Sequence, residues 1–299
     1  MSGHYPDPID PTRTRIGWIG IGVMGGAMAA RLISAGFSVC IYARTPSKAA
    51  HLISLGASLA ASPADLAASS DVVFTMIGHP SDVRAVVLHT LLPSLNPNTV
   101  LIDHTSSHPA LARLIHDSAA ERRCHSVDAP VSGGDVGARE GRLAIFAGGE
   151  GPVVRWLKPL LDVLGRVSYM GSAGKGQSCK IANQISVGGN LVGLSEGLVF
   201  AGKAGLEKRK FLEAVRGGAA GSAAMELFGE RMIGRDFRAG GFAEYMVKDL
   251  GMGLGGVVLP GAALWKEMFA AMVANGDGKL GTQGVVKVIE RINGLELEG

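Results

Sequence analysis

The sequence has few cysteines, few aromatic residues and few charges for its length. Its 299 residues include 3 cysteines, 5% aromatic residues and 18% charged residues. Cys40, Cys124 and Cys179 lie far apart and lack the spacing of metal ligands, so we expect reduced thiols and no metal site. The net charge is only +3, and no stretch concentrates lysine and arginine. We therefore expect neither a nucleic-acid partner nor an anionic membrane partner.

Long hydrophobic runs and targeting patterns are also scarce. The longest uncharged stretches, residues 181–195 and 250–265, are short for a membrane span and contain glycines. The opening residues, MSGHYPDPIDPTRTR, carry three prolines and no apolar core, unlike a signal peptide or an ordinary transit peptide. These features predict a soluble, cytoplasmic protein with a flexible N-terminal lead over residues 1–14.

The composition that is present favours a compact α/β protein. Hydrophobic residues make up 47% of the chain, and 44 residues are glycine, which argues against disorder. The length allows two domains with separate cores. We expect an N-terminal Rossmann-type domain with a doubly wound parallel sheet over residues 15–173. An all-α domain, concerned with substrate and oligomerisation, is expected over residues 174–299.

A glycine motif near the N-terminus predicts a dinucleotide site. Apolar residues 16–19 read as a strand, and Gly20, Gly22 and Gly25 follow with G-x-G-x-x-G spacing. Residues 27–33 then favour a helix, and residues 38–43 read as a second strand. The glycines serve the turn, the approach of backbone to pyrophosphate, and helix packing. Further strands at 71–78, 99–105 and 125–131, separated by helical stretches, indicate a parallel sheet.

The end of the second strand bears on the choice between NAD and NADP. An acid there would hold the ribose hydroxyl of NAD, whereas a basic residue accommodates the 2′-phosphate of NADP. Residues 43–48, ARTPSK, contain no carboxylate but offer Arg44, Thr45 and Lys48. We predict that NADP(H) is preferred and that NAD(H) is possible. A solvated basic turn is the alternative interpretation.

A second glycine-rich loop, DAPVSGGDVGAREGRL, spans residues 128–143. Ser132, Gly133 and Gly134 present a hydroxyl and consecutive backbone N–H groups, which suit a carboxylate. A β-bulge or hairpin is the alternative interpretation. The stretch is not G-x-S-x-G and has no neighbouring histidine, so acyl transfer is disfavoured.

Residues 174–184, GKGQSCKIANQ, place a lysine at the mouth of an apolar stretch. If Lys180 begins a helix, Asn183 and Gln184 lie three and four residues along, on the same face. Beside a cofactor and an anion site, the ammonium group can act as general acid, and partial desolvation would lower its pKa toward the working range. Taken alone, a lysine extending from a helix end into water is the simpler interpretation.

Together these motifs resemble the β-hydroxyacid dehydrogenase family. This family includes 3-hydroxyisobutyrate dehydrogenases, tartronate semialdehyde reductases and glyoxylate/succinic semialdehyde reductases. GIGVMGGAMAARL resembles its cofactor signature, DAPVSGGDVGAREG its substrate signature, GKGQSCKIANQ its catalytic signature, and MVKDLGMGL a later cofactor segment. The resemblance covers residues 15–293. It implies that Lys180 is catalytic and that Ser132, Gly133, Gly134, Asn183 and Gln184 bind substrate. It also implies cofactor contacts at Gly20, Ile21, Gly22, Val23, Met24, Gly25, Ile77, Gly78, Asp82, Thr105, Ser106 and Lys248.

The chain departs from the family pattern in two places. Many members have asparagine four residues after the lysine, where this chain has Gln184, with Asn183 before it. Which amide reaches the substrate stays open. In residues 249–261 four glycines, Gly251, Gly253, Gly255 and Gly256, disfavour a helix. We expect a shortened or distorted helix beside Lys248.

The C-terminal half reads as helical. A long apolar helix should end at Gly205, followed by helices over KRKFLEAVRGG, WKEMFAAMVANG and GVVKVIERING. Because an apolar helix needs a cover and family members pair through such helices, we expect a homodimer or homotetramer.

The leading prediction is an NADP(H)-dependent reductase of small carboxylated aldehydes, with Lys180 as general acid/base. The substrates considered are glyoxylate and succinic or tartronate semialdehyde. One alternative is an NAD-dependent 3-hydroxyisobutyrate dehydrogenase working oxidatively. Another is a catalytically silent module that binds NADP and serves interactions.

Overall fold

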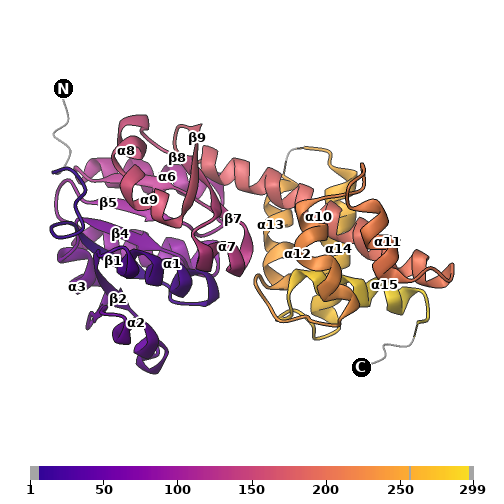
Figure 1. The fold of residues 1–299 in the computed structure, drawn as a ribbon. Coiled ribbons are helices and arrows are strands. Elements are labelled where there is room, and N and C mark those ends of the chain that lie inside the picture. Colours follow the sequence, from indigo (N-terminus) through magenta and orange to yellow (C-terminus); the bar gives the residue numbers. More distant parts are fainter. Residues whose placement is uncertain (1–6, 256, 296–299) are drawn as a thin grey trace. The chain divides into compact units, whose positions relative to one another are not determined.

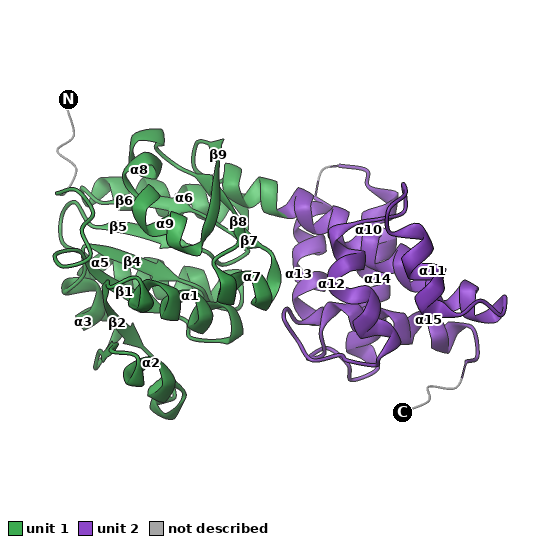
Figure 2. Ribbon diagram, viewed as in Figure 1, with its two compact units in different colours: residues 1–180 green, residues 181–299 purple. Residues whose placement is uncertain are grey.

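The computed structural model describes residues 7–255 and 257–295, and the chain divides into two compact units, residues 1–180 and 181–299 (Figure 2). The division falls inside helix α10 (Lys175–Lys203). The sequence placed the boundary at 173/174, just before this helix begins. The helix also begins earlier than predicted, so Lys180 lies in its second turn rather than at its start.

Unit 1 is built on one sheet with the strand order β3-β2-β1-β4-β5-β6-β8-β7, and β9 pairs with β8 (Figure 1). The strands from β3 to β6 are parallel and have the order of a nucleotide-binding fold, which confirms the predicted fold class. β8 runs antiparallel to β6 and β7. The strands are β1 (Arg15–Ile19), β2 (Ser38–Tyr42), β3 (Ser58–Leu59), β4 (Val72–Thr75), β5 (Val100–Asp103), β6 (His125–Asp128), β7 (Val131–Ser132), β8 (Leu143–Gly148) and β9 (Gly165–Gly171).

The single strand predicted over 125–131 is wrong, because β6 ends at Asp128 and β7 begins at Val131. Pro130 lies between them, and proline has no N–H group with which to continue a strand ladder. The carbonyl of Pro130 accepts a hydrogen bond from the N–H of Phe146. Pairing with β5 therefore ends before this proline, whereas pairing with β8 begins at Asp128 and continues through β7.

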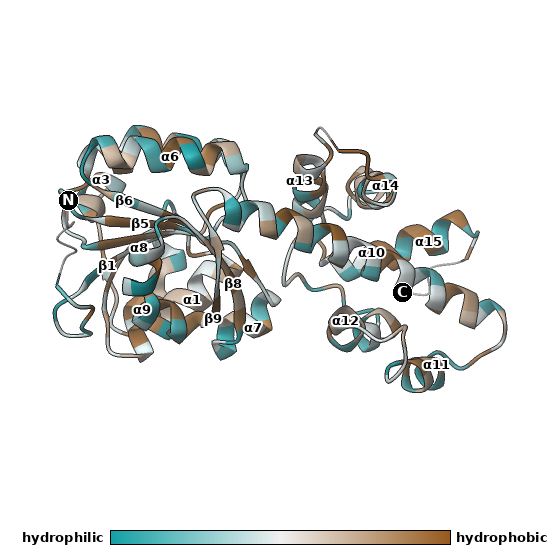
Figure 3. Cartoon of the chain, turned by 90° about the horizontal axis from the view of Figure 1, so that it is seen from above, coloured by the Kyte–Doolittle hydropathy of each residue, from teal (hydrophilic) through white to brown (hydrophobic). Residues whose placement is uncertain are grey.

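Helices cover both faces of the sheet, because side chains alternate along each strand. Ile16 and Trp18 of β1 face α1 and α9, whereas Ile19 faces the core formed by α3, η2 and α6. Figure 3 shows the hydrophobic colour along the central strand β5. The helices of unit 1 are α1 (Val23–Ser34), η1 (Pro46–Ala49), α2 (Ala50–Ser54), α3 (Pro63–Ala68), α4 (Pro80–Val83), the π-helix η2 (Arg84–Leu91), α5 (Leu92–Ser94), α6 (Pro109–Glu121), α7 (Gly134–Glu140), α8 (Gly151–Trp156) and α9 (Lys158–Leu164).

The segment predicted as a flexible lead is attached to unit 1 over its described part, residues 7–14. The N–H of Thr14 donates to the carbonyl of Asp10, and the N–H of Asp10 donates to Thr14 Oγ1 at 2.9 Å. The indole of Trp156 donates to the carbonyl of Asp7. These residues therefore form a structured turn, and residues 1–6 lie outside the described part of the chain.

Unit 2 is helical, as predicted, and its core forms around α10. Leu191, Val192 and Leu198 of α10 are buried there. The remaining helices are α11 (Lys208–Val215), α12 (Ala223–Ile233), α13 (Ala243–Gly253), α14 (Pro260–Ala274), η3 (Thr282–Val285) and α15 (Val286–Ile292). In the described ranges, α10 is also the one helix long and apolar enough to cross a membrane. Its buried leucines give it the role of a core helix in unit 2.

Small residues let other elements approach α10 closely. The indole of Trp265, on α14, lies against Gly189, where an added Cβ would come within 3.2 Å of its ring nitrogen. At the far end, Gly205 has a φ of +75°, and the N–H of Leu206 returns to the carbonyl of Ala201. This glycine therefore ends the helix in the way that the sequence predicted.

The glycine-rich segment beside Lys248 is helical for longer than its composition suggests. α13 includes Lys248 and continues through Gly251 to Gly253, where Leu254 caps it. An added Cβ at Gly253 would lie 2.9 Å from the side chain of Ile181, so this glycine permits close packing onto α10 within unit 2. The helix then stops, and Gly256 lies outside the described residues.

Candidate functional site

The first glycine turn joins β1 to α1 and requires glycine for two separate reasons. Gly20 has a φ of +96°, a left-handed conformation, and a Cβ there would overlap the carbonyl oxygen of Met76. A Cβ on Gly25 would overlap the carbonyl oxygen of Gly20. That oxygen also accepts a hydrogen bond of 3.0 Å from the indole of Trp18. The turn is therefore held tightly from both sides.

Gly22 differs from the other two glycines, because an added Cβ would meet nothing within 4 Å. It caps α1, whose first turn carries no acidic residue and whose start has no side-chain hydrogen bond. Backbone N–H groups at an open helix start suit a phosphate group. The residues around this opening, Ile21, Val23 and Met24, thus fit a bound pyrophosphate.

The segment after β2 presents its basic residues to solvent. Ala43 is buried, whereas Arg44, Thr45 and Lys48 are exposed. Thr45 caps the short helix η1, and residues 43–48 contain no carboxylate. The exposed basic side chains can accept the 2′-phosphate of NADP. They are equally compatible with the other interpretation of this segment, a basic turn in contact with solvent.

Backbone and side-chain hydrogen bonds join the ends of β4 and β5. The N–H of Ile77 donates to Thr105 Oγ1 at 3.0 Å. The buried carboxylate of Asp103 accepts from Thr75 Oγ1 at 2.8 Å and from the N–H of Thr105 at 3.0 Å. Because carboxyl ends of parallel strands meet at one edge, Gly20, Ile77 and Thr105 are brought to the same edge of the sheet.

Asp82, a predicted cofactor contact, has a local structural role. It lies exposed in the first turn of α4 and forms a capping box with His79, whose N–H donates to Asp82 Oδ2 at 3.2 Å. Gly78 and Ser106 lie half-buried after β4 and β5.

Two buried titratable groups lie at neighbouring strand ends: His104 directly after β5, and Asp128 as the last residue of β6. His104 is fully buried, and its Nδ1 lies 2.5 Å from the carbonyl of Ala129. Its ring stacks on Phe74, with centroids 5.5 Å apart. Burial lowers the pKa of His104 to about 4. At neutral pH the imidazole is therefore uncharged, with its proton on Nδ1.

The second group, Asp128, holds the start of α10. Burial raises the pKa of Asp128 to about 6, although hydrogen bonds from the N–H groups of Gly174 and Gln177 act in the opposite direction. These two bonds measure 2.7 and 2.8 Å. A carboxylate at this position stabilises buried N–H groups of the first helical turn that have no partner within the helix. This capping role was not predictable from the sequence, because the bonded residues lie more than forty positions apart.

The second glycine loop combines the two structures considered for it. Ser132 ends strand β7 and pairs with Ala144 of β8, as a hairpin would. Gly133 and Gly134 then have φ values of +130° and +64° and lead into α7. An added Cβ on Gly134 would meet nothing within 4 Å. The one acid of the first turn, Asp135, is paired with Arg139 at 2.7 Å, so its charge is partly neutralised beside the open backbone.

Lys180 is buried, with 8% of its surface exposed. It is the last residue of unit 1 and lies on α10, one turn after Gln177. A side chain extending into water would be mostly exposed, so the simpler interpretation of this lysine does not describe the structure.

The predicted residues of unit 2 form a polar chain between α10 and α13. Asn183 Nδ2 donates to Gln184 Oε1 at 3.0 Å, and Gln184 Nε2 donates to Asp249 Oδ2 at 2.8 Å. The other carboxylate oxygen of Asp249 lies 3.2 Å from Lys248 Nζ. Sequence reasoning missed Asp249, although its position directly after Lys248 was a signal. These contacts link two predicted substrate residues, Asn183 and Gln184, to a predicted cofactor residue, Lys248.

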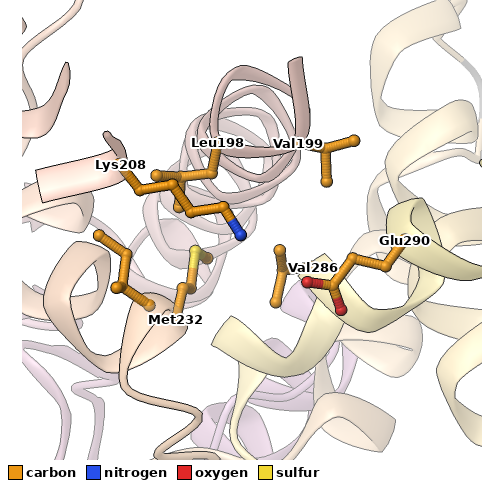
Figure 4. Close-up of a pocket in the computed structure, with 7 residues that line it drawn as sticks. Leu198, Val199, Lys208, Met232, Val286 and Glu290 are labelled. Carbon is orange, nitrogen blue, oxygen red and sulfur yellow. The ribbon is translucent and has the colours of Figure 1, made fainter. Parts of the chain in front are cut away.

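Unit 2 also contains a small pocket between α10, α11, α12 and α15 that includes none of the predicted residues. Figure 4 shows Lys208 and Glu290 at this pocket beside apolar side chains. Its lining is Leu198, Val199, Lys208, Met232, Ile233, Val286 and Glu290. The carboxylate of Glu290 already accepts two hydrogen bonds from Arg235, at 2.8 and 2.9 Å. We interpret the pocket as part of the packing of unit 2. In residues 7–255 and 257–295, no three His, Cys, Asp or Glu side chains are grouped to hold a metal ion.

Two family models match consecutive parts of the chain. Residues 15–172 match the NAD-binding domain of 6-phosphogluconate dehydrogenase. Residues 174–289 match a domain described as the NAD-binding domain of NADP-dependent 3-hydroxyisobutyrate dehydrogenase. The two matches meet at the beginning of α10.

Curated relatives and solved structures match nearly the whole chain. An Arabidopsis thaliana protein named probable 3-hydroxyisobutyrate dehydrogenase-like 3, mitochondrial, is 59% identical, covering 99% of this chain and 93% of its own. The 2-hydroxy-3-oxopropionate reductase of Escherichia coli is 36% identical, covering 92% and 97%. A structure of Mycobacterium tuberculosis 3-hydroxyisobutyrate dehydrogenase with L-serine is 27% identical, with a TM-score of 0.83, covering 92% and 99%.

The expected cytoplasmic location is wrong. The relative just described and two others from Arabidopsis thaliana, which are 57% and 48% identical, are all named as mitochondrial. The two others cover 99% and 98% of this chain and 100% and 90% of their own. The proline-rich opening residues were therefore a poor guide to location.

Proposed function

Because this chain belongs to the β-hydroxyacid dehydrogenase family and is an NAD(P)-dependent oxidoreductase of the 3-hydroxyisobutyrate dehydrogenase type, we propose that it reduces small carboxylated aldehydes with NADP(H). The candidate substrates are glyoxylate, succinic semialdehyde and tartronate semialdehyde. The observation that carries the proposal is a buried lysine, Lys180, on a helix whose first turn is bonded to the ends of β5 and β6.

The cofactor, when bound, supplies a hydride to the carbonyl carbon of the aldehyde. The chain's part is to hold it: the open N–H groups at Gly22 receive the pyrophosphate, and the Thr105–Ser106 segment borders it at the sheet edge. Ile77, Gly78 and Asp82 line the adjoining side. The family resemblance also assigns Lys248 of α13 to the cofactor, and its ammonium group forms an ion pair with Asp249.

Lys180 is the general acid of the reduction. As the carbonyl carbon accepts the hydride, negative charge develops on the carbonyl oxygen, and the Lys180 ammonium donates a proton to it. In the oxidative direction the neutral amine accepts that proton. Ser132, Gly133 and Gly134 hold the substrate carboxylate through the hydroxyl and backbone N–H groups, which turn at two left-handed glycines.

We assign the substrate-binding amide to Asn183 rather than Gln184. The amide nitrogen of Gln184 is already bonded to Asp249, and its oxygen accepts from Asn183. A buried carboxylate that lost this donor would be left poorly paired, so Gln184 is costly to redirect. Asn183 keeps an amide oxygen for a substrate hydroxyl.

The NADP preference rests on the segment after β2 and on one family description. Arg44 and Lys48 are exposed where the 2′-phosphate would lie, with no carboxylate in residues 43–48 to repel it. The family model that matches residues 174–289 takes its description from an NADP-dependent 3-hydroxyisobutyrate dehydrogenase. An NAD-linked enzyme working oxidatively would need a ribose-binding acid that this segment does not offer.

Location and assembly extend the proposal. The names of the three Arabidopsis relatives support a mitochondrial location. The apolar length of α10, with Phe200 exposed on it, supports a homodimer or homotetramer. Light scattering at micromolar concentration tests the assembly, and a monomer would contradict it.

Initial rates test the function directly. The purified protein is given NADPH or NADH with each of the three aldehydes, and 3-hydroxyisobutyrate with NADP⁺ or NAD⁺ for the reverse reaction. We expect NADPH-dependent turnover that falls at least a hundredfold in Lys180→Ala, since general acid–base catalysis contributes about 10²–10⁴-fold. The Ser178→Ala variant, on the exposed side of the same helix, serves as the control. NADPH binding without turnover would instead identify a catalytically silent module.

A further inference from the structure

Gln177 is a buried polar residue to which the proposed reaction assigns no role. Only 1% of its surface is exposed. Its side-chain Nε2 donates to the carbonyl of Thr105 at 2.7 Å, and its Oε1 accepts from the N–H of Ser107 at 2.8 Å. One amide therefore binds both backbone groups that flank Ser106.

The backbone of Gln177 is held as firmly as its side chain. Its N–H donates to Asp128, which also accepts from Gly174. Gly176 lies between them, and a Cβ there would overlap the carbonyl oxygen of Phe146 on β8. The first turn of α10 is thus fixed to the sheet, and Lys180 follows Gln177 by three residues.

We propose that Gln177 is a positioning residue that fixes the Thr105–Ser107 segment against the helical turn carrying Lys180. The inference rests on the proposed function, in which this segment borders the cofactor and Lys180 supplies the proton. It identifies the residue that sets the spacing between them. Because the hydride donor and the proton donor must address adjacent atoms of one carbonyl group, an error of about 1 Å in this spacing costs on the order of a hundredfold in rate.

The chemistry of position 177 is specific. A carbonyl oxygen and an N–H group must be satisfied together, so the residue needs one donor and one acceptor at the end of a two-methylene chain. Methionine has a similar length and provides neither. An ionised glutamate accepts from Ser107 and turns a second oxygen toward the carbonyl of Thr105. A protonated glutamic acid, however, donates through O–H and accepts through C=O, like glutamine.

The experiment compares the wild-type protein with Gln177→Met, Gln177→Glu and the control Ser178→Ala. For each we measure the dissociation constant of NADPH by fluorescence, kcat and KM, and the isotope effect with NADPH deuterated at the transferred position. Thermal unfolding reports whether each variant folds. The Gln177→Met change is also made in the Lys180→Ala protein.

We expect folded Gln177→Met to bind NADPH severalfold more weakly and to lose at least tenfold in kcat, with a larger isotope effect. Because the effect on kcat passes through Lys180, the same change should cost less than about threefold in the Lys180→Ala protein. The kcat of Gln177→Glu relative to wild type should rise as the pH falls and the buried carboxyl group takes up a proton. Asp103, His104 and Asp128 face the same region and are present in both proteins, so the ratio compares the group at position 177 within the same set of neighbouring charged groups.

The inference is overturned if Gln177→Met keeps the wild-type NADPH affinity, kcat and isotope effect. It is also overturned if its loss of activity only matches the fraction of unfolded protein. Should Gln177→Met fail to fold, a pH-independent ratio for Gln177→Glu overturns it. If the wild-type protein reduces none of the aldehydes, the proposed function fails separately. NADPH binding then decides: weaker binding by Gln177→Met supports the positioning role, and unchanged binding refutes it.

Discussion

His104 should make unit 1 less stable in mild acid, and the His104→Asn substitution isolates this effect. In the folded chain burial lowers the imidazole pKa from 6.5 to about 4. Between these values the unfolded chain binds a proton that the folded chain excludes, so stability is lost as the pH falls. This pKa difference corresponds to a loss of about 3 kcal/mol in the free energy of unfolding once the pH is below both values. About 2 kcal/mol of that is lost by pH 5.

Asparagine is the informative replacement, because its amide nitrogen can donate to the carbonyl of Ala129 as Nδ1 does. It does not titrate, so its smaller size costs the same free energy at every pH. We expect the stability difference between the wild type and His104→Asn to shrink by about 2 kcal/mol between pH 7.5 and pH 5.

Urea unfolding, followed by tryptophan emission in a Trp265→Phe background, measures this difference for unit 1, which keeps Trp18 and Trp156. A difference that stays constant within about 0.5 kcal/mol across this pH range would refute the reasoning. It would mean that His104 takes up its proton as readily in the folded chain as in the unfolded chain.

Three further predictions concern other parts of unit 1. Asp128→Asn should show the opposite pH dependence: the folded carboxyl binds its proton below about 6 and the unfolded one below 3.8, so wild-type stability rises by about 3 kcal/mol as the pH falls through this window. Urea unfolding from pH 7 to pH 4 checks this, and a pH-independent gap between the two proteins contradicts it. Arg44→Ala should raise KM for NADPH about tenfold or more and leave KM for NADH unchanged, since a hydrogen bond to a charged group is worth about 1.5–3 kcal/mol; equal changes in steady-state assays would count against the 2′-phosphate contact. Gly22→Ala should weaken NADPH binding without lowering the unfolding temperature, because its Cβ meets no protein atom within 4 Å. Gly25→Ala should lower both the affinity for NADPH and the unfolding temperature. Calorimetric titration and thermal unfolding separate the two, and identical behaviour would argue against an open phosphate site at Gly22.

Local backbone requirements were predictable from the sequence. Gly20 is required by its left-handed φ and Gly25 by the carbonyl oxygen of Gly20, both inside one strand–turn–helix unit, so their spacing alone predicted the turn. The alternation of apolar runs with helical stretches likewise predicted that β1, β2, β4, β5 and β6 form a parallel sheet, whereas the two-residue strand β3 was missed. β8 and β9 were missed, although LAIFAG is a recognisable apolar run. The polar GRVSYMG of β9 carries little strand signal by itself, because its structure depends on pairing with β8.

Long-range partners explain what the sequence could not predict in the site. Gln177 bonds to residues about seventy positions away, and no local pattern identifies such a pair. The choice between Asn183 and Gln184 depends in the same way on Asp249, 65 positions further on. Burial also converts His104 and Asp128 into groups with shifted pKa values, which depends on the packing of the whole sheet rather than on neighbouring residues.

The Gln184–Asp249 hydrogen bond has a consequence for how this site can change during evolution. A glutamine and an aspartate together span the gap between α10 and α13 with three methylene groups. Gln184→Asn alone would leave Asp249 out of reach, but Gln184→Asn combined with Asp249→Glu would restore the same total length. Residues in contact tend to covary, so we expect homologues with asparagine at the first position to carry a longer acid opposite it. The two positions would then be inherited as one exchangeable pair, and a family alignment in which they vary independently would contradict this.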